Sequence, residues 1–221
     1  MRNFQENIVP STAQNSKPVF IHHNPKFNKK ILFVGNSITK HAPKADIGWY
    51  NDCGMAASCL EKDYVHLLVE KAKQYDENIS FAIAAIADFE RGFFTLNLQD
   101  LYQDAADYNA DIVIMFFGAN VAVEYDTMEN PPKTFGAAYE ELRNFVSHNG
   151  KAKVFHSQGY YIRPVLDAEK LAVAEKYGDE FINIEDIRSL PETHGMFNHP
   201  GDLGMQMIAD RFWEYIENEL K

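Results

Sequence analysis

The sequence predicts an α/β protein of three layers, in which helices cover both faces of a central five-stranded parallel sheet. Two observations support this fold class. Short, continuous apolar runs alternate along the chain with longer segments of helical periodicity. The chain has 221 residues, enough for one such domain and too few for two. We therefore expect a single domain over residues 29–221, preceded by an extended arm over residues 1–28.

Five apolar runs have the length and composition of strands that are buried on both faces. They cover residues 30–35, 79–85, 110–118, 152–158 and 180–186. The run "ADIVIMFFG" over 110–118 is the most apolar of them. The polar arm is broken by Pro10, Pro18 and Pro25 and contains "PVFIHH", which could add an edge strand. The sheet is thus expected to hold five parallel strands, with a possible sixth at one edge.

Segments of helical periodicity separate these runs. They cover residues 60–75, 95–108, 133–150, 164–178 and 202–220. Pro164 opens the fourth helix and Gly178 closes it, as is typical of helix ends. Asp202 is expected to cap the last helix. Alternating strands and helices require right-handed crossovers, and ligands then bind beyond the carboxyl ends of the strands.

The composition disfavours several classes of partner. The chain is 46% hydrophobic and 24% charged, as an ordinary globular protein is, and its formal net charge is -11. This charge would repel nucleic acids and anionic membranes. No apolar run has the length of a signal peptide or of a membrane span. Cys53 and Cys59 resemble reduced cytosolic thiols more than a disulfide, so we expect a cytoplasmic protein and leave its oligomeric state open.

Three loops, two after strands and one before the last helix, hold residue types that are used to cleave esters. The stretch "ILFVGNSITKH" runs from a strand directly into Ser37, the loop after the third strand is "GAN" with Asn120, and "THGMFNHPGDLGM" before the last helix holds His194 and His199. A serine hydroxyl attacks a carbonyl only when a base removes its proton, and histidine titrates near neutral pH. The backbone N–H of Ser37 and the Asn120 amide could hold the oxyanion that forms.

The motifs "GNSIT", "GAN" and "HPGD", in this order, resemble the conserved blocks of the SGNH (GDSL-like) hydrolases. The resemblance covers nearly everything from residue 30 onward, and the segment "IGWYNDCGMAASCLEKDYVHLL" is similar to a bacterial subgroup of that family. It implies a flavodoxin-like fold and an esterase, lipase or carbohydrate deacetylase that needs neither cofactor nor metal. By position it implies Ser37 as nucleophile and His199 as general base, with Ser37 and Asn120 lining the oxyanion hole.

The sequence departs from the family pattern at three places. Asn36 stands where the first block usually has an aspartate. The family has a glycine whose backbone N–H donates to the oxyanion. In "AIADFERG" Ala87 or Asp88 lies near the expected place and Gly92 comes too late, so we choose the N–H of Ala87 as this donor. Met196 stands three residues before His199, where the family has the acid partner of the histidine. Either a backbone carbonyl holds the ring in a Ser–His dyad, or another carboxylate substitutes, and Asp202 and Glu192 are the nearest in sequence.

Two aromatic residues in loops are candidates for a surface that contacts the substrate. Trp49 and Tyr160 are expected to contact a sugar or an acyl group, and the guanidinium of Arg163 could bind a carboxylate or brace its loop. The sequence is thus interpreted as a serine esterase that hydrolyses small acyl esters, such as acetyl esters, of an alcohol or carbohydrate. Two alternatives stay open: an acyltransferase at the same site, and a carbohydrate-binding relative without catalysis.

Overall fold

The central sheet of the protein has six strands. We describe residues 18–21, 26 and 28–220 of a computed structural model, in which the strand order is β1-β3-β2-β4-β5-β6. The strands are β1 (Pro18–Ile21), β2 (Lys29–Gly35), β3 (Ile79–Ala85), β4 (Ile112–Phe116), β5 (Lys153–Ser157) and β6 (Glu180–Ile182). Strands β2 to β6 are parallel, so the five parallel strands predicted from the apolar runs are confirmed.

The sixth strand comes from the segment that we considered as an edge strand. Strand β1 pairs antiparallel with β3, with Ile21 opposite Ala82. The rest of the predicted arm over residues 1–28 lies outside the described residues, apart from positions 26 and 28. Every residue of β3 is buried, as expected for a strand with neighbours on both sides.

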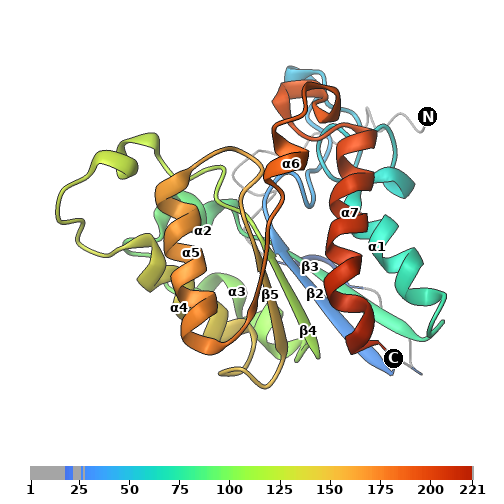
Figure 1. Ribbon diagram of the computed structural model, residues 1–221, viewed down its shortest axis with the longest axis horizontal. Helices are drawn as coiled ribbons and strands as arrows, with labels where there is room; N and C mark the ends of the chain where they lie inside the picture. Colours follow the sequence, from blue (N-terminus) through green and yellow to red (C-terminus); the bar gives the residue numbers. More distant parts are fainter. Residues whose placement is uncertain (1–17, 22–25, 27, 221) are drawn as a thin grey trace.

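Helices cover both faces of the sheet (Figure 1). They are α1 (Tyr64–Lys73), α2 (Ala87–Gly92), α3 (Leu98–Asp107), α4 (Phe135–Val146), α5 (Pro164–Tyr177), α6 (Glu185–Arg188) and α7 (Asp202–Ile216). Helices α1 and α7 cover one face, and α2 to α5 cover the other. Alternate residues of β2 point to opposite layers: Ile31 and Phe33 join the core under α1 and α7, whereas Leu32 and Val34 join the core under α3 and α4. The predicted three-layer fold class is confirmed.

Two local predictions were incomplete or wrong. The helix α2 was not predicted, because six residues are too few for a periodic pattern. Asp202 does not cap α7, since the cap position belongs to Gly201. The Asp202 carboxylate instead accepts hydrogen bonds from the backbone and hydroxyl of Ser58 and from Lys62.

No helix within the described part of the chain is both long enough and apolar enough to span a lipid bilayer.

Candidate active site

Ser37 and His199 meet at the carboxyl end of the sheet. Ser37 lies in the turn after β2, and His199 lies in the loop that enters α7. The Ser37 Oγ is 2.9 Å from the His199 Nε2, although 162 residues separate the two along the chain. The turn is fixed locally, because the Asn36 carbonyl accepts from the backbone N–H groups of Thr39 and Lys40. The geometry therefore suits proton transfer from the hydroxyl to the imidazole.

Two acceptors hold the other nitrogen of the imidazole. The His199 Nδ1 is 2.8 Å from the Tyr161 Oη and 3.0 Å from the Phe197 carbonyl oxygen. When Ser37 donates to Nε2, Nδ1 carries the ring proton and donates to these oxygens. The Tyr161 hydroxyl then donates to the Phe197 carbonyl, 3.5 Å away. A phenol and a backbone carbonyl thus stand where a carboxylate orients the histidine in a serine triad.

The backbone before His199 has an unusual conformation. Phe197 and Asn198 have φ angles of 56° and 57°, in the left-handed region that favours glycine. This conformation costs on the order of 1 kcal/mol for each residue. It places the Phe197 carbonyl within reach of the imidazole two residues later.

None of the side chains considered as an acid partner contacts His199. Met196 is about half exposed, and Glu192 is also exposed. Asp202 is bound by Ser58 and Lys62. Of the two alternatives that the sequence left open, the geometry therefore matches a dyad held by a backbone carbonyl, with the Tyr161 phenol as an addition.

Burial shifts the pKa values of both His199 and Tyr161. Desolvation lowers the pKa of His199, the Phe197 carbonyl partly opposes this effect, and the charge of His41 adds to it. Desolvation also raises the pKa of Tyr161 above its usual value, so its phenol stays neutral at neutral pH.

We expect the pH profile of ester hydrolysis to follow His199. Only the neutral imidazole accepts a proton, and its pKa is lowered, so kcat/KM should rise with pH and level off with a midpoint below about 6.5. Initial rates between pH 4 and pH 9 measure this midpoint. A midpoint clearly above the ordinary histidine value would contradict the assignment of a desolvated imidazole without an anionic partner.

Tyr161→Phe removes one of the two acceptors and leaves the ring in place. We expect kcat/KM to fall about 3- to 10-fold, since one hydrogen bond contributes about 1 kcal/mol net and the Phe197 carbonyl remains. Initial rates on a small acetyl ester measure the change. Tyr177→Phe is the matched control, because the Tyr177 hydroxyl contacts Glu140 on the outer surface. Equal rates in native protein and Tyr161→Phe would show that the carbonyl alone orients His199.

Four predicted catalytic residues line one small cavity. The cavity measures about 160 Å³ and is lined by Ser37, His41, Met55, Ala87, Arg91, Asn120 and His199. Ala87 is the first residue of α2, so its N–H has no partner within the helix and can serve a ligand. The structure therefore brings the predicted nucleophile, base and oxyanion donors together. Their catalytic roles remain predictions.

The Asn120 amide is fixed at both ends. Its Nδ2 donates to the Glu90 Oε2 at 2.6 Å, and its Oδ1 accepts from the Arg91 Nη2 at 3.1 Å. An amide nitrogen carries two hydrogens, so one remains for an oxyanion. Glu90 is fully buried, and desolvation raises its pKa while the hydrogen bonds from Asn120, Asn36 and Gly118 oppose the rise.

Trp49 and Tyr160 require a correction. Trp49 is only 2% exposed and donates from its indole to the His41 carbonyl, and Tyr160 is 3% exposed with its hydroxyl against Thr193. Both rings belong to the core under α1 and α7 and lie outside the cavity lining. They therefore offer no stacking surface to a substrate. The sequence could not separate a buried aromatic loop residue from an exposed one.

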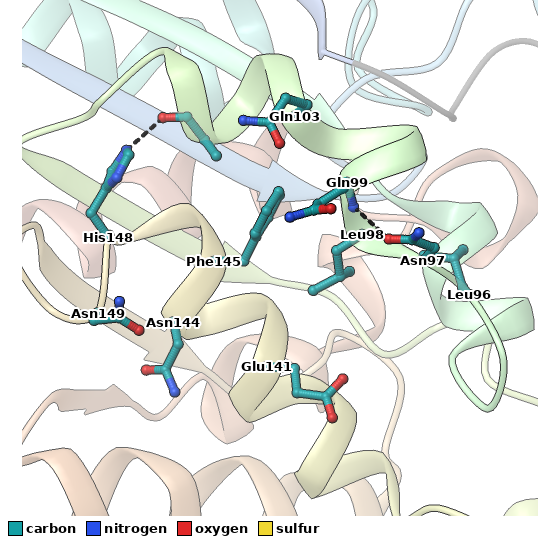
Figure 2. A pocket seen from close by; sticks show the side chains of 11 residues that line it. Leu96, Asn97, Leu98, Gln99, Gln103, Glu141, Asn144, Phe145, His148 and Asn149 are labelled. Atoms are coloured by element: carbon teal, nitrogen blue, oxygen red, sulfur yellow. Dashed lines mark hydrogen bonds between the residues drawn. The ribbon is translucent and has the colours of Figure 1, made fainter.

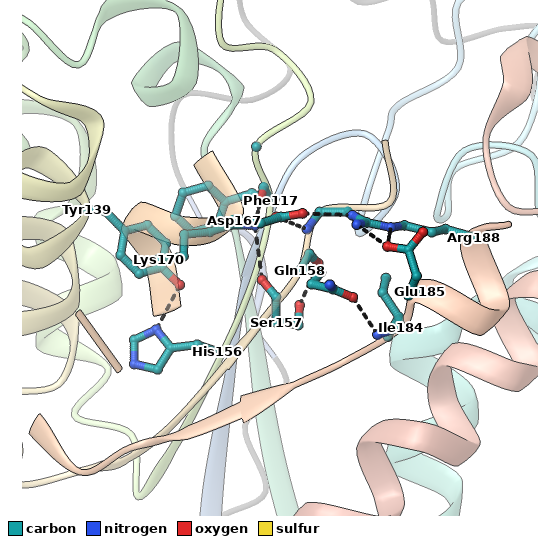
Figure 3. A network of polar contacts seen from close by, with 12 residues as sticks. Phe117, Tyr139, His156, Ser157, Gln158, Asp167, Lys170, Ile184, Glu185 and Arg188 are labelled. Atoms are coloured by element: carbon teal, nitrogen blue, oxygen red, sulfur yellow. Dashed lines mark hydrogen bonds and ion pairs between the residues drawn. The ribbon is translucent and has the colours of Figure 1, made fainter. Parts of the chain in front are cut away.

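A buried ionic network joins the loops that carry Asn120 and Tyr161 (Figure 3). Lys170 is fully buried and donates to the carbonyls of Phe117 and Ser157, at the ends of β4 and β5. Its charge is balanced by Asp167, which also accepts from Arg188 and from the Gly159 backbone. Lys170 and Asp167 of α5 and Arg188 of α6 thus hold the loops after β4 and β5 in place.

Arg163 has the bracing role that we considered for it. Its guanidinium pairs with Asp126 and donates to the carbonyls of Val121 and Ala122. It therefore fixes the segment after Asn120 and does not line the cavity.

A larger cavity lies elsewhere in the described part of the chain. It measures about 670 Å³ and lies between α3 and α4, with residues such as Gln99, Gln103, Asn144 and Phe145 in its wall (Figure 2). This lining contains no pair of nucleophile and base like Ser37 and His199. We therefore take the smaller cavity as the candidate active site.

The sequence did not reveal Glu90 or the bond from Tyr161 to His199. Glu90 had a weak signal, since it is a charged residue in the mostly apolar stretch "AIADFE" that begins at the end of a buried strand. Tyr161 follows a strand at the active edge, but nothing in the sequence aims its hydroxyl at the imidazole.

Comparisons with known proteins found structural neighbours only. No family model matches the chain, and no curated protein matches it in sequence. An active-site mutant of a family two carbohydrate esterase from Clostridium thermocellum superposes with a TM-score of 0.59 at 18% identity, over 88% of this chain and 64% of that one. The same esterase is known in complex with cellohexaose, with a TM-score of 0.57 at 18% identity over 88% and 65% of the two chains.

A further neighbour has nearly the same length. Axe2, an acetylxylan esterase from Geobacillus stearothermophilus, superposes with a TM-score of 0.57 at 18% identity, over 85% of this chain and 94% of that one. The present chain thus shares its fold with carbohydrate esterases.

Proposed function

We propose that this protein is a serine esterase that removes small acyl groups, most simply acetyl, from a carbohydrate or another alcohol. The observation that carries the proposal is the 2.9 Å contact between the Ser37 Oγ and the His199 Nε2 within a cavity that Asn120 also lines. The shared fold with carbohydrate esterases supports the reaction class.

The reaction follows from the positions of the groups. His199 takes the Ser37 proton while the Oγ attacks the ester carbonyl, and the oxyanion accepts hydrogen bonds from the N–H of Ser37, the N–H of Ala87 and the Asn120 amide. The protonated imidazole then gives its proton to the leaving alkoxide, and an acyl-enzyme remains on Ser37. Water, activated by the neutral His199, releases the acid and restores the hydroxyl.

The size of the cavity supports a short acyl group. Its volume of about 160 Å³ is well below the roughly 300–1,000 Å³ of pockets for drug-sized ligands. Met55 and His41 occupy its wall, which leaves little room for a long chain. The two structural neighbours are described as a carbohydrate esterase and an acetylxylan esterase, so an acetylated sugar is the first substrate to test.

The test is acetate release from acetylated xylo-oligosaccharides, together with p-nitrophenyl esters of two, four and eight carbons. We expect hydrolysis of both substrate types, with kcat/KM for the eight-carbon ester at least about tenfold below that for acetate, because overpacking costs about 1–3 kcal/mol. Background rates on every ester would refute the proposal. Preference for the longest chain would refute the assignment of a small acyl group.

The two other functions are weaker. An acyltransferase would use the same acyl-enzyme, and transfer of acetyl to an added sugar in place of water would reveal it. Two features would favour a protein that binds carbohydrates without catalysis. One is a His199 with no group to orient it, and the other is a surface of Trp49 and tyrosines on which a sugar could stack. Because Tyr161 and the Phe197 carbonyl contact His199 and Trp49 is buried, both supports are lost.

A further inference from the structure

Glu90 is a fully buried carboxylate that no step of the proposed reaction uses. It lies on α2, next to the cavity, with 0% of its surface exposed. Its Oε1 accepts from the Gly118 N–H at 2.6 Å, from the Asn36 Nδ2 at 3.0 Å and, more weakly, from the Asn120 N–H at 3.4 Å. Its Oε2 accepts from the Asn120 Nδ2 at 2.6 Å.

All four groups that contact the Glu90 carboxylate are hydrogen-bond donors. A protonated carboxyl group would need an acceptor for its own hydrogen, and none of the four partners offers one. Within the described residues no lysine, arginine or histidine forms a salt bridge with Glu90, so N–H groups are the direct partners of its charge, and the buried Lys170 attracts it from a longer distance. A buried charge without partners costs several kcal/mol, so these hydrogen bonds are needed to keep the Glu90 carboxylate ionised in its position.

We propose that Glu90 is the positioning residue of the oxyanion hole, acting as an anionic clamp on the Asn120 amide and on the Gly118–Asn120 loop. This inference rests on the proposed esterase function of the site. Glu90 binds one hydrogen of the Asn120 Nδ2 and Arg91 binds the Oδ1, so the amide cannot flip and its second hydrogen keeps one direction. Donors that are fixed before the reaction stabilise an oxyanion without reorganisation.

The same carboxylate also reaches the turn of the nucleophile. The Asn36 Nδ2 donates to Glu90, while its Oδ1 accepts from the Ile38 N–H, on the far side of Ser37. One buried charge therefore ties the turn after β2 to the loop after β4. It also accounts for asparagine at position 36, because an aspartate there would place a second carboxylate 3.0 Å from the first.

The test is a double-mutant cycle between Glu90→Gln and Asn120→Ala. Glutamine has the same shape as glutamate, but its NH₂ group is itself a donor. It must face at least one of the N–H groups that contact Glu90, and that hydrogen bond is lost. In the native background we expect Glu90→Gln to lower kcat about 10²-fold on an acetyl ester, with KM nearly unchanged. In the Asn120→Ala background the same substitution should cost less than about threefold, since the clamped donor is already absent.

Glu70→Gln is the matched control. Glu70 is exposed on α1, pairs with Lys73 at 2.7 Å and contacts neither Asn120 nor Arg91 among the described residues, so the same type of substitution there should leave kcat unchanged. A native kcat in Glu90→Gln would overturn the proposal. An equal loss in both backgrounds would also overturn it, because a structural defect would not depend on Asn120.

Asn120→Asp decides the question if Glu90→Gln does not fold. Asn120 is partly exposed, and an aspartate there would face the Glu90 carboxylate. We expect Asn120→Asp to be slower than Asn120→Ala, because the loop is then repelled from its clamp as well as deprived of the donor. Equal rates in the two variants would show that Glu90 does not hold this position as an anion.

A side-chain amide spectrum separates failure of the clamp from failure of the esterase function. The Asn120 NH₂ resonances, identified by their loss in Asn120→Ala, should shift in Glu90→Gln and stay in place in Glu70→Gln. If the native protein hydrolyses no ester and these shifts are seen, the function is wrong and the clamp stands. Resonances that do not move would overturn the clamp whatever the activity.

Discussion

Ser37→Ala is expected to lower hydrolysis of small acetyl esters by about 10⁴-fold or more, to the rate that the oxyanion donors alone support. Among the described residues that line this cavity, Ser37 is the one with a hydroxyl, so we expect the acyl-enzyme to form on it. Initial rates on p-nitrophenyl acetate measure the loss. Mass spectrometry of the native protein, quenched during turnover, should show one added acetyl group on the peptide that contains Ser37.

His199→Ala should cost a similar factor, and the double variant should be no slower than either single variant. The hydroxyl and the imidazole act as one unit across their 2.9 Å contact, so their effects are not additive. Ser189→Ala is the matched control, since Ser189 is exposed and its hydroxyl contacts only Glu185 among the described residues. Activity of Ser37→Ala within tenfold of native would exclude Ser37 as the nucleophile.

Asn120→Ala is expected to lower kcat about 10²- to 10³-fold while KM stays nearly constant. A single oxyanion donor contributes about 3–4 kcal/mol in the transition state and much less in the ground state, which explains the split. Asn144→Ala provides the control, because Asn144 lines the larger cavity between α3 and α4. If Asn144→Ala were the slower variant, the chemistry would have to be sought in that larger cavity.

The layers of the fold could be predicted because their signal is local. The apolar run over residues 79–85 coincides with β3, and the helix expected from Pro164 to Gly178 coincides with α5 and its cap. Burial on both faces demands continuous apolar strands, and one-sided burial demands a periodic helix, so each element carries its own pattern. The short α2 has no room for such a pattern and was missed.

The candidate site could be predicted in part. Ser37, Asn120 and His199 follow the ends of strands or precede a helix, and the parallel topology brings such loops to one edge. The contacts of Tyr161 with His199 and of Glu90 with Asn120 depend on side-chain directions across 38 and 30 residues of chain. No spacing rule encodes these directions. Trp49 was misplaced for a related reason, because the indole is amphipathic and suits both a core and a binding surface.

The long separation of the nucleophile from its base has a consequence for biosynthesis. Ser37 leaves the ribosome early, whereas His199 is made 162 residues later, in the loop that enters α7. At about 5–20 residues per second this interval lasts about 10–30 s. A growing chain therefore carries the proposed nucleophile without its proposed base. If the proposed function is right, the rate at which ester hydrolysis recovers during refolding would measure how fast the loop before α7 brings His199 to Ser37.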